Sequence, residues 1–214
     1  MTITQLLSSA RRRYNSVNDS FFADEELINM FYDACLDFAR TTLCIERVYS
    51  TSTVASQQEY SYPTSAIAIK RIQYDGKKLQ PINMRQDDSI TGLNQSTTST
   101  GTPQYYFIFN ETIYLRPIPA AVGTLKIWSY NEAQELTASS SIEIPTQFHL
   151  DLVDYVASEM AAKDLNFTTA KYYLEKWERR KVEAKKWTQK KKRTDGFGAV
   201  MDEETSVETY LGVI

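Results

Sequence analysis

The stretch FFADEELINMFYDACLDFARTTLCIERVYSTSTV, residues 21–54, decides the fold, because a helical pattern gives way to a strand pattern within it. The acids at 24–26 favour a helix start, since negative charge stabilises the N-terminal end of a helix. Apolar residues then keep one helical face for about five turns. They are Leu27, Phe31, Ala34, Cys35 and Phe38. From Val48 onward β-branched and aromatic residues dominate, which predicts strands.

Further helices are predicted on both sides of this stretch. Residues 2–13 have apolar positions at three- and four-residue steps and three arginines at the end, where cations suit the helix dipole. Pro145 suits a first helical position, and an apolar face continues from it to about Leu165. Thr168 can cap a last long helix that ends near Lys192.

The middle of the chain predicts antiparallel strands. Residues 67–74 alternate between the two faces of a strand and reach an Asp75-Gly76 turn before 78–82. A second hairpin is expected over 105–116, with its turn at Asn110-Glu111, and another strand over 125–130. One or two helical turns are expected over 84–93, and a Ser/Thr/Gly loop over 95–103.

This order of elements predicts an α+β protein that is mainly α. It has a four-helix core of two helical hairpins, an inserted antiparallel β-unit and an extended C-terminal tail. The expected boundaries are 1–47 for the N-terminal helices of the core, 48–141 for the β-rich unit, 142–193 for the C-terminal helices and 194–214 for the tail.

Charge is spread unevenly along the 214 residues, whose net charge is −3. Residues 168–193 hold 11 Lys and Arg against 3 acids, which leaves −11 for the rest of the chain. The last helix is interpreted either as a solvated helix or as a docking surface for an acidic partner or a nucleic-acid backbone. The residues expected to make electrostatic contacts with another subunit or partner are Arg179, Arg180, Lys190, Lys191, Lys192 and Arg193.

The tail after Gly196 mixes acids with apolar residues and is too short for a core of its own. Such a segment can fill a groove or extend a sheet edge on a partner and become ordered there. The residues expected to bind a partner are Phe197, Val200, Met201, Tyr210, Leu211 and Ile214.

The sequence holds no catalytic pattern, so no catalytic, cofactor-binding or metal-binding residue is assigned and the protein is not expected to be an enzyme. His149 is the one histidine, and no Cys/His cluster has zinc spacing. The carboxylate pairs, at 25–26, 87–88 and 203–204, are more simply a helix start, a loop and a tail.

The two cysteines, Cys35 and Cys44, would lie about 13.5 Å apart along a helix, too far to bridge, and are expected to be free thiols. No secretory leader and no apolar run of membrane length is found, so the protein is expected to be made in the cytoplasm and to have no membrane partner.

Several segments, in this order, resemble the head-to-tail adaptor (connector) proteins of tailed bacteriophages. The opening carries Leu6-Leu7 and then the 22–40 helix with its Asp24-Glu25-Glu26-Leu27 start. The segments that resemble the family's two hairpins and its return to helix are 60–79, 101–119 and 144–157. Together the likeness covers roughly residues 3–187.

The resemblance implies a structural virion protein at the head–tail junction, or neck. Such adaptors form a homo-oligomeric ring, typically of twelve copies, beneath the portal protein and extend the DNA channel towards the tail. Packaged DNA passes through the lumen without sequence-specific binding, and a downstream tail or nozzle protein, with or without tail fibres, attaches below. The C-terminal segments of such proteins commonly reach into the portal, which gives the tail here a partner.

Two other function classes stay open at this point. One is a nucleic-acid-binding protein that uses the basic C-terminal helix, and the other is a virion-associated cell-wall hydrolase that uses a pair of carboxylates.

Overall fold

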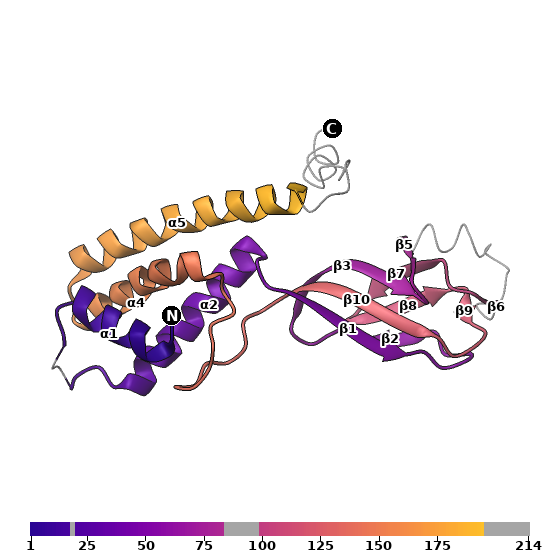
Figure 1. Ribbon diagram of the computed structural model, residues 1–214, viewed down its shortest axis with the longest axis horizontal. Coiled ribbons are helices and arrows are strands. Elements are labelled where there is room, and N and C mark those ends of the chain that lie inside the picture. The colour runs from indigo at the N-terminus through magenta and orange to yellow at the C-terminus, as the bar shows by residue number, and fades with distance from the viewer. Residues whose placement is uncertain (18–19, 84–98, 195–214) are drawn as a thin grey trace. The chain divides into compact units, whose positions relative to one another are not determined.

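A computed structural model describes residues 1–17, 20–83 and 99–194, with side chains described up to Lys190. The chain divides into two compact units, which Figure 1 shows as helices and strands. The helical unit holds Met1–Thr42 and the chain from Glu135 onward, and the β unit holds Leu43–Gln134. The two ends of the chain therefore build one unit, and its middle builds the other.

The helical unit begins with two helices from the N-terminal part of the chain. Helix α1, Ile3–Arg13, starts at a capping box in which the Thr2 side chain accepts from the Gln5 backbone and the Gln5 side chain accepts from that of Thr2. Helix α2, Asp24–Thr42, has the three acids predicted for its first turn. Both helices agree with the sequence prediction to within a few residues.

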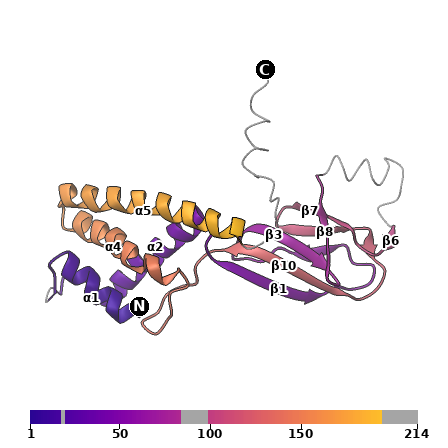
Figure 2. The ribbon, with the colours of Figure 1, turned by 45° about the horizontal axis from the view of Figure 1, so that its top comes forward.

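The later helices complete the helical unit. A short 3-10 turn, η1, Thr146–Phe148, leads into α4, His149–Lys163, and α5 follows over Phe167–Thr194. In both views α4 and α5 run side by side (Figures 1 and 2). Their shared core with α2 is apolar and fully buried. It includes Leu27, Phe31, Phe38, Leu152, Val153, Val156 and Trp177.

The β unit contains two four-stranded sheets. The first has the order β1-β10-β3-β4, all antiparallel, with β1 Glu46–Ser52, β10 Thr124–Asn131, β3 Ala66–Tyr74 and β4 Lys77–Lys78. The second has the order β2-β8-β7-β5, with β2 Glu59–Ser61, β8 Thr112–Arg116, β7 Tyr105–Phe109 and β5 Gln80–Pro81. Side chains from both sheets form one core. It includes Tyr60, Ile72, Tyr106, Ile113, Leu115, Leu125 and Ile127.

Both predicted hairpin turns are present. Asp75 and Gly76 have φ of 45° and 79°, and Asn110 and Glu111 have φ of 45° and 56°. Positive φ at both central residues is the geometry of a type I′ turn, whose twist matches that of the flanking strands. The Asp-Gly sequence predicts such a turn directly, whereas Glu111 adopts the positive φ without the freedom of glycine.

The expectation of a mainly α protein around a four-helix core is wrong. Of the residues that the structure describes, about 42% are helical and about 26% lie in strands, which is a mixed α+β fold with strands in several sheets. Nor is the β unit wholly antiparallel, because β5 pairs with β7 and β6, Thr100–Gly101, pairs with β9, Ile118–Pro119, in parallel. The sequence prediction failed for two reasons. A two-residue strand is too short to show an alternating pattern, and the prediction did not include a hydrophobic core formed by the strands themselves.

Some predictions fall outside the described residues. The helical turns expected within 84–93 lie there, as do residues 95–98 of the expected loop 95–103 and the whole of the tail from residue 195. Among the described helices, none has the length and apolar character needed to cross a membrane. Cys35 is buried, Cys44 is half-buried, and the two are not joined in a disulfide.

Candidate functional site

Helix α5 carries the basic segment that the sequence marks as a contact surface, and one of its faces is buried. Trp177, Lys181, Ala184 and Thr188 are all less than a tenth exposed and recur at three- and four-residue steps. The indole Nε1 of Trp177 donates to Asp37 Oδ2 of α2 at 3.0 Å. The helix is therefore anchored along its length, and its opposite face is left to solvent.

Some of the positive charge of α5 stabilises the contact between α5 and α2, and Lys181 is the example. Its Nζ lies 2.7 Å from Asp37 Oδ2 and 2.8 Å from Glu178 Oε1. Burial alone would lower the pKa of this amine, but the hydrogen bonds to Asp37 and Glu178 outweigh burial and raise it. Lys181 therefore stays charged as part of the α2–α5 contact and is unavailable to a partner.

Two of the predicted contact residues, Arg179 and Arg180, differ in whether they already make ion pairs. Arg180 pairs with Glu183 at 2.8 Å and lies 3.6 Å from Asp151, and the hydrogen bond to Glu183 raises its pKa. Arg179 is exposed and has no ion pair within the described part of the chain. Arg179 is the better candidate for a partner contact, since it can bind an acid without breaking an existing pair.

The exposed cations of α5 form a basic stripe. Arg179, Lys186 and Lys190 lie at steps of seven and four residues on the solvent side of α5, with Lys185 exposed beside them. Residues 191–193 continue α5, but their side chains lie outside the described residues, as do Phe197, Val200, Met201, Tyr210, Leu211 and Ile214.

His149 is a packed residue of the helical unit. It is 2% exposed, its Nε2 lies 2.7 Å from the Ile144 carbonyl oxygen, and its Nδ1 lies 3.1 Å from the Met1 ammonium. A carbonyl only accepts, so Nε2 carries the proton and Nδ1 accepts from Met1. Both ring nitrogens thus make hydrogen bonds within the helical unit. Neither nitrogen is available for proton transfer to a substrate.

The burial of His149 predicts a pH dependence of stability. Burial lowers the pKa of its imidazole below the ordinary 6.5, so as the pH falls the unfolded chain takes up a proton before the folded chain does. Stability rises with pH wherever the unfolded state binds more protons, so it is expected to fall as the pH drops through about 6.5.

Urea unfolding between about pH 7.5 and pH 5.5 measures this effect. The variant His149→Gln is the control, because it removes the titrating group and should flatten the profile even where it lowers stability overall. An equally steep profile in the variant would contradict the assignment.

Within the described residues no three His, Cys, Asp or Glu side chains gather as a metal site would require. Of the three carboxylate pairs, Glu25-Glu26 lies in the first turn of α2, and the pairs at 87–88 and 203–204 lie outside the described residues. Burial raises the pKa of Asp151, but that carboxylate already lies against Arg180.

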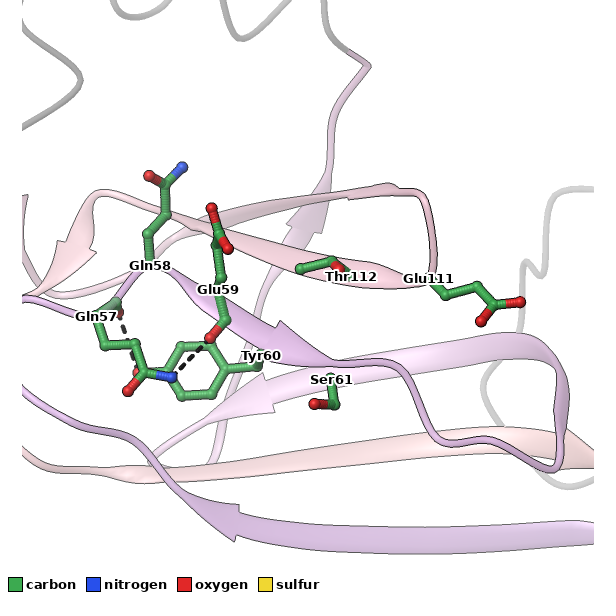
Figure 3. Close-up of a pocket in the computed structure, with 7 residues that line it drawn as sticks. All are labelled: Gln57, Gln58, Glu59, Tyr60, Ser61, Glu111 and Thr112. Carbon is green, nitrogen blue, oxygen red and sulfur yellow. Dashed lines mark hydrogen bonds between the residues drawn. The ribbon is translucent and has the colours of Figure 1, made fainter.

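The β unit contains a polar groove that sequence reasoning missed. It runs along β2 and the β7–β8 turn, and we call it the acidic groove (Figure 3). Its lining residues are Gln57, Gln58, Glu59, Tyr60, Ser61, Glu111 and Thr112. The Asn110-Glu111 turn was predicted, but nothing in the sequence indicates that β2 pairs with β8 and so lies beside this turn.

In the described part of the chain, the charged groups either hold the helical unit together, as at Lys181 and Asp37, or face solvent, as a contact surface for another macromolecule would. Comparison with family models gives the particular family. The chain belongs to the SU10 adaptor protein family, whose model matches residues 1–199. No curated protein matches the chain.

Membership of this family confirms the resemblance to bacteriophage head-to-tail adaptors. The chain is thus a bacteriophage adaptor protein with a structural role, and it is a component of the virion that associates with other head and tail proteins.

Proposed function

We propose that the protein forms a homo-oligomeric ring of typically twelve copies at the neck of the virion, beneath the portal protein. The ring extends the DNA channel, and its lower side is the platform for a downstream tail or nozzle protein and any tail fibres. The observation that carries this proposal is the match to the adaptor family over 199 of the 214 residues.

The C-terminal tail, 194–214, is the proposed portal-binding segment. Its apolar members (Phe197, Val200, Met201, Tyr210, Leu211 and Ile214) supply the area that a groove on the portal would cover, and its acids supply charge. Attachment at the end of α5 supports this role, because the anchored helix fixes the point from which the tail starts.

The basic stripe of α5 is the proposed contact with an acidic surface of a neighbouring subunit or the portal. The proposed contact also includes Lys191, Lys192 and Arg193, which follow in the sequence. A second candidate function, binding of duplex DNA, is favoured by the same exposed cations, Arg179, Lys185, Lys186 and Lys190.

Removal of the tail is expected to abolish portal binding while leaving the fold intact. The variant that lacks 196–214 keeps every described residue of α5, so its unfolding midpoint should match that of the full chain. Its affinity for the portal protein of the same phage should fall by more than about a hundredfold, because the apolar segment that orders on binding is gone.

Pull-down with the portal protein and a mass measurement of the purified assembly test the proposal together. A particle with the mass of a closed ring on the portal is the expected result for the full chain. Undiminished capture of the truncated chain would refute the role of the tail. Tight binding to duplex DNA with a steep salt dependence, and no assembly with the portal, would favour the second candidate instead.

A further inference from the structure

The β unit has a basic edge. Strand β4 is the outer strand of the first sheet and consists of Lys77 and Lys78, both exposed. Lys78 lies opposite Gln73, and Gln73 lies opposite Lys126, so the row crosses three strands on one face of the sheet. Lys77 lies opposite Tyr74, so it points to the other face of β4. We call Lys77, Lys78 and Lys126 the basic edge. In the chain as described, none of the three makes an ion pair, so their charge is available to a partner.

The turn that leads into this edge is fixed by hydrogen bonds. Two bonds join the Asp75-Gly76 turn to Thr124, because the Asp75 backbone donates to the Thr124 carbonyl at 2.9 Å and the Thr124 backbone donates to Asp75 Oδ1 at 2.7 Å. The only acid of the turn is thereby used to fix it. A preorganised element of this kind loses little entropy on binding.

The acidic groove has the opposite character. Glu59 lies on β2, the outer strand of the second sheet, and Glu111 lies in the β7–β8 turn, at the far end of the lining residues from Gln57 and Gln58 (Figure 3). Over the described ranges neither carboxylate makes an ion pair. Two bonds hold the groove in shape: the Gln57 side chain donates to the Glu59 carbonyl at 2.8 Å, and the Tyr62 backbone donates to the Glu111 carbonyl at 3.0 Å.

We propose that the basic edge of one copy binds in the acidic groove of the next copy around the assembly. The inference rests on the proposed ring and names the contact that builds it. A ring requires heterologous contacts, in which each subunit offers two different, complementary surfaces. Both surfaces belong to the same compact unit, so the fit needs no particular arrangement of the helical unit.

A second copy fits this basic edge better than a nucleic acid does. On the same sheet face, the rings of Trp128 and Tyr130 are already covered by Arg71 at 4.5 Å and Lys70 at 5.7 Å, so one side of each ring is closed to a base. Lys70 is also paired with Glu46 at 3.0 Å, which places a carboxylate where a phosphate backbone would run. An acidic groove on an identical chain meets neither obstacle.

The proposed contact is small. Such a contact is expected if copies of the chain assemble only when the portal protein gathers them. A few charge pairs at an exposed edge give weak affinity between two free copies, and salt screens them. When a portal holds several copies together, each contact becomes effectively intramolecular and the ring closes by avidity. The contact therefore sets register and direction around the ring.

Two charge-reversed variants test the contact. The edge variant carries Lys77→Glu and Lys78→Glu, and the groove variant carries Glu59→Lys and Glu111→Lys. Each should fail to form the ring on the portal protein and should raise the dissociation constant for self-association by at least about tenfold, because like charges meet at every contact. Lys171→Glu, at an exposed lysine of the helical unit, is the control and should assemble like the natural chain.

An equimolar mixture of the two variants gives the sharpest readout. Every contact between the edge variant and the groove variant is again of opposite sign, so the mixture should form rings of alternating copies although neither variant does so alone. Recovery in the mixture also shows that both variants are folded. Sedimentation velocity and electron microscopy with the portal protein measure these outcomes.

The possible failures are distinguishable. If the natural chain forms rings and both variants do so equally well, this contact is wrong and the proposed ring stands. If the natural chain forms no ring with the portal, the proposed function itself fails. If the edge variant loses binding to a short DNA duplex and the mixture restores no assembly, the basic edge binds nucleic acid and the inference is overturned.

Discussion

Replacing Trp177 by alanine is expected to lower the free energy of unfolding of the helical unit by about 4 kcal/mol. Trp177 is fully buried, with its ring 5.7 Å from that of Phe38 and 5.6 Å from that of Tyr155. Truncation removes these contacts and leaves a cavity among α2, α4 and α5. It also removes one of the two donors that Asp37 Oδ2 accepts, with Lys181 left as the other.

Urea unfolding followed by helical circular dichroism measures this loss, and two variants serve as comparisons. Trp177→Phe keeps an aromatic ring but no donor, so it should cost less than alanine at the same position. Trp187→Ala is the matched control, because Trp187 is 36% exposed and packs edge-on against Phe148. Equal losses for Trp177→Ala and Trp187→Ala would contradict the central place of Trp177 in the core.

The contrast between the two tryptophans shows which features of the fold could be predicted from the sequence. Helical periodicity places Trp177 and Trp187 on one broad face of α5, and it does not say which of them has a core beside it. That depends on Asp37 and Phe38, which lie some 140 positions earlier in the chain. Local order was predictable because it depends on neighbours in sequence, as at the Asp75-Gly76 and Asn110-Glu111 turns.

The balance of the fold was not predictable in the same way. Strands such as β5 and β9 are two residues long, and they exist because Gln80 and Ile118 meet partners far along the chain. The acidic groove arises similarly from the pairing of β2 with β8. Pairing across long loops is set by the packing of the whole sheet, and no period within Glu59–Ser61 reports it.

The exposed charges of α5 were also only partly predictable from the sequence. Counting residues gives a strongly basic segment, and the sequence treats Arg179 and Arg180 alike. The structure separates them, because Arg180 lies against Asp151 and Glu183 while Arg179 faces solvent. Part of the charge that the sequence assigns to a partner is thus used within the fold, and the surface left for assembly is smaller and better defined.

Asp154 provides the second large effect, because it is a buried carboxylate between two helices that carry cations. Its side chain is 2% exposed and pairs with Arg13 of α1 and, at 2.9 Å, with Lys176 of α5. Asp154→Asn keeps the shape but removes the charge, which leaves two cations facing a neutral amide. Breaking a buried pair from one side is costly, so stability should fall by about 3 kcal/mol.

The control for Asp154→Asn is Asp24→Asn, at a carboxylate that pairs with Arg11 at 2.6 Å but is 68% exposed. An exposed pair gains little over water, so this change should cost less than about 1 kcal/mol. Urea unfolding of both variants at low and high salt separates the two cases. Salt should shrink the effect at Asp24 and leave most of the effect at Asp154, because ions do not enter the contact among α1, α4 and α5. Equal losses at the two sites, or a loss at Asp154 that salt removes, would show that this carboxylate does not hold the helices together.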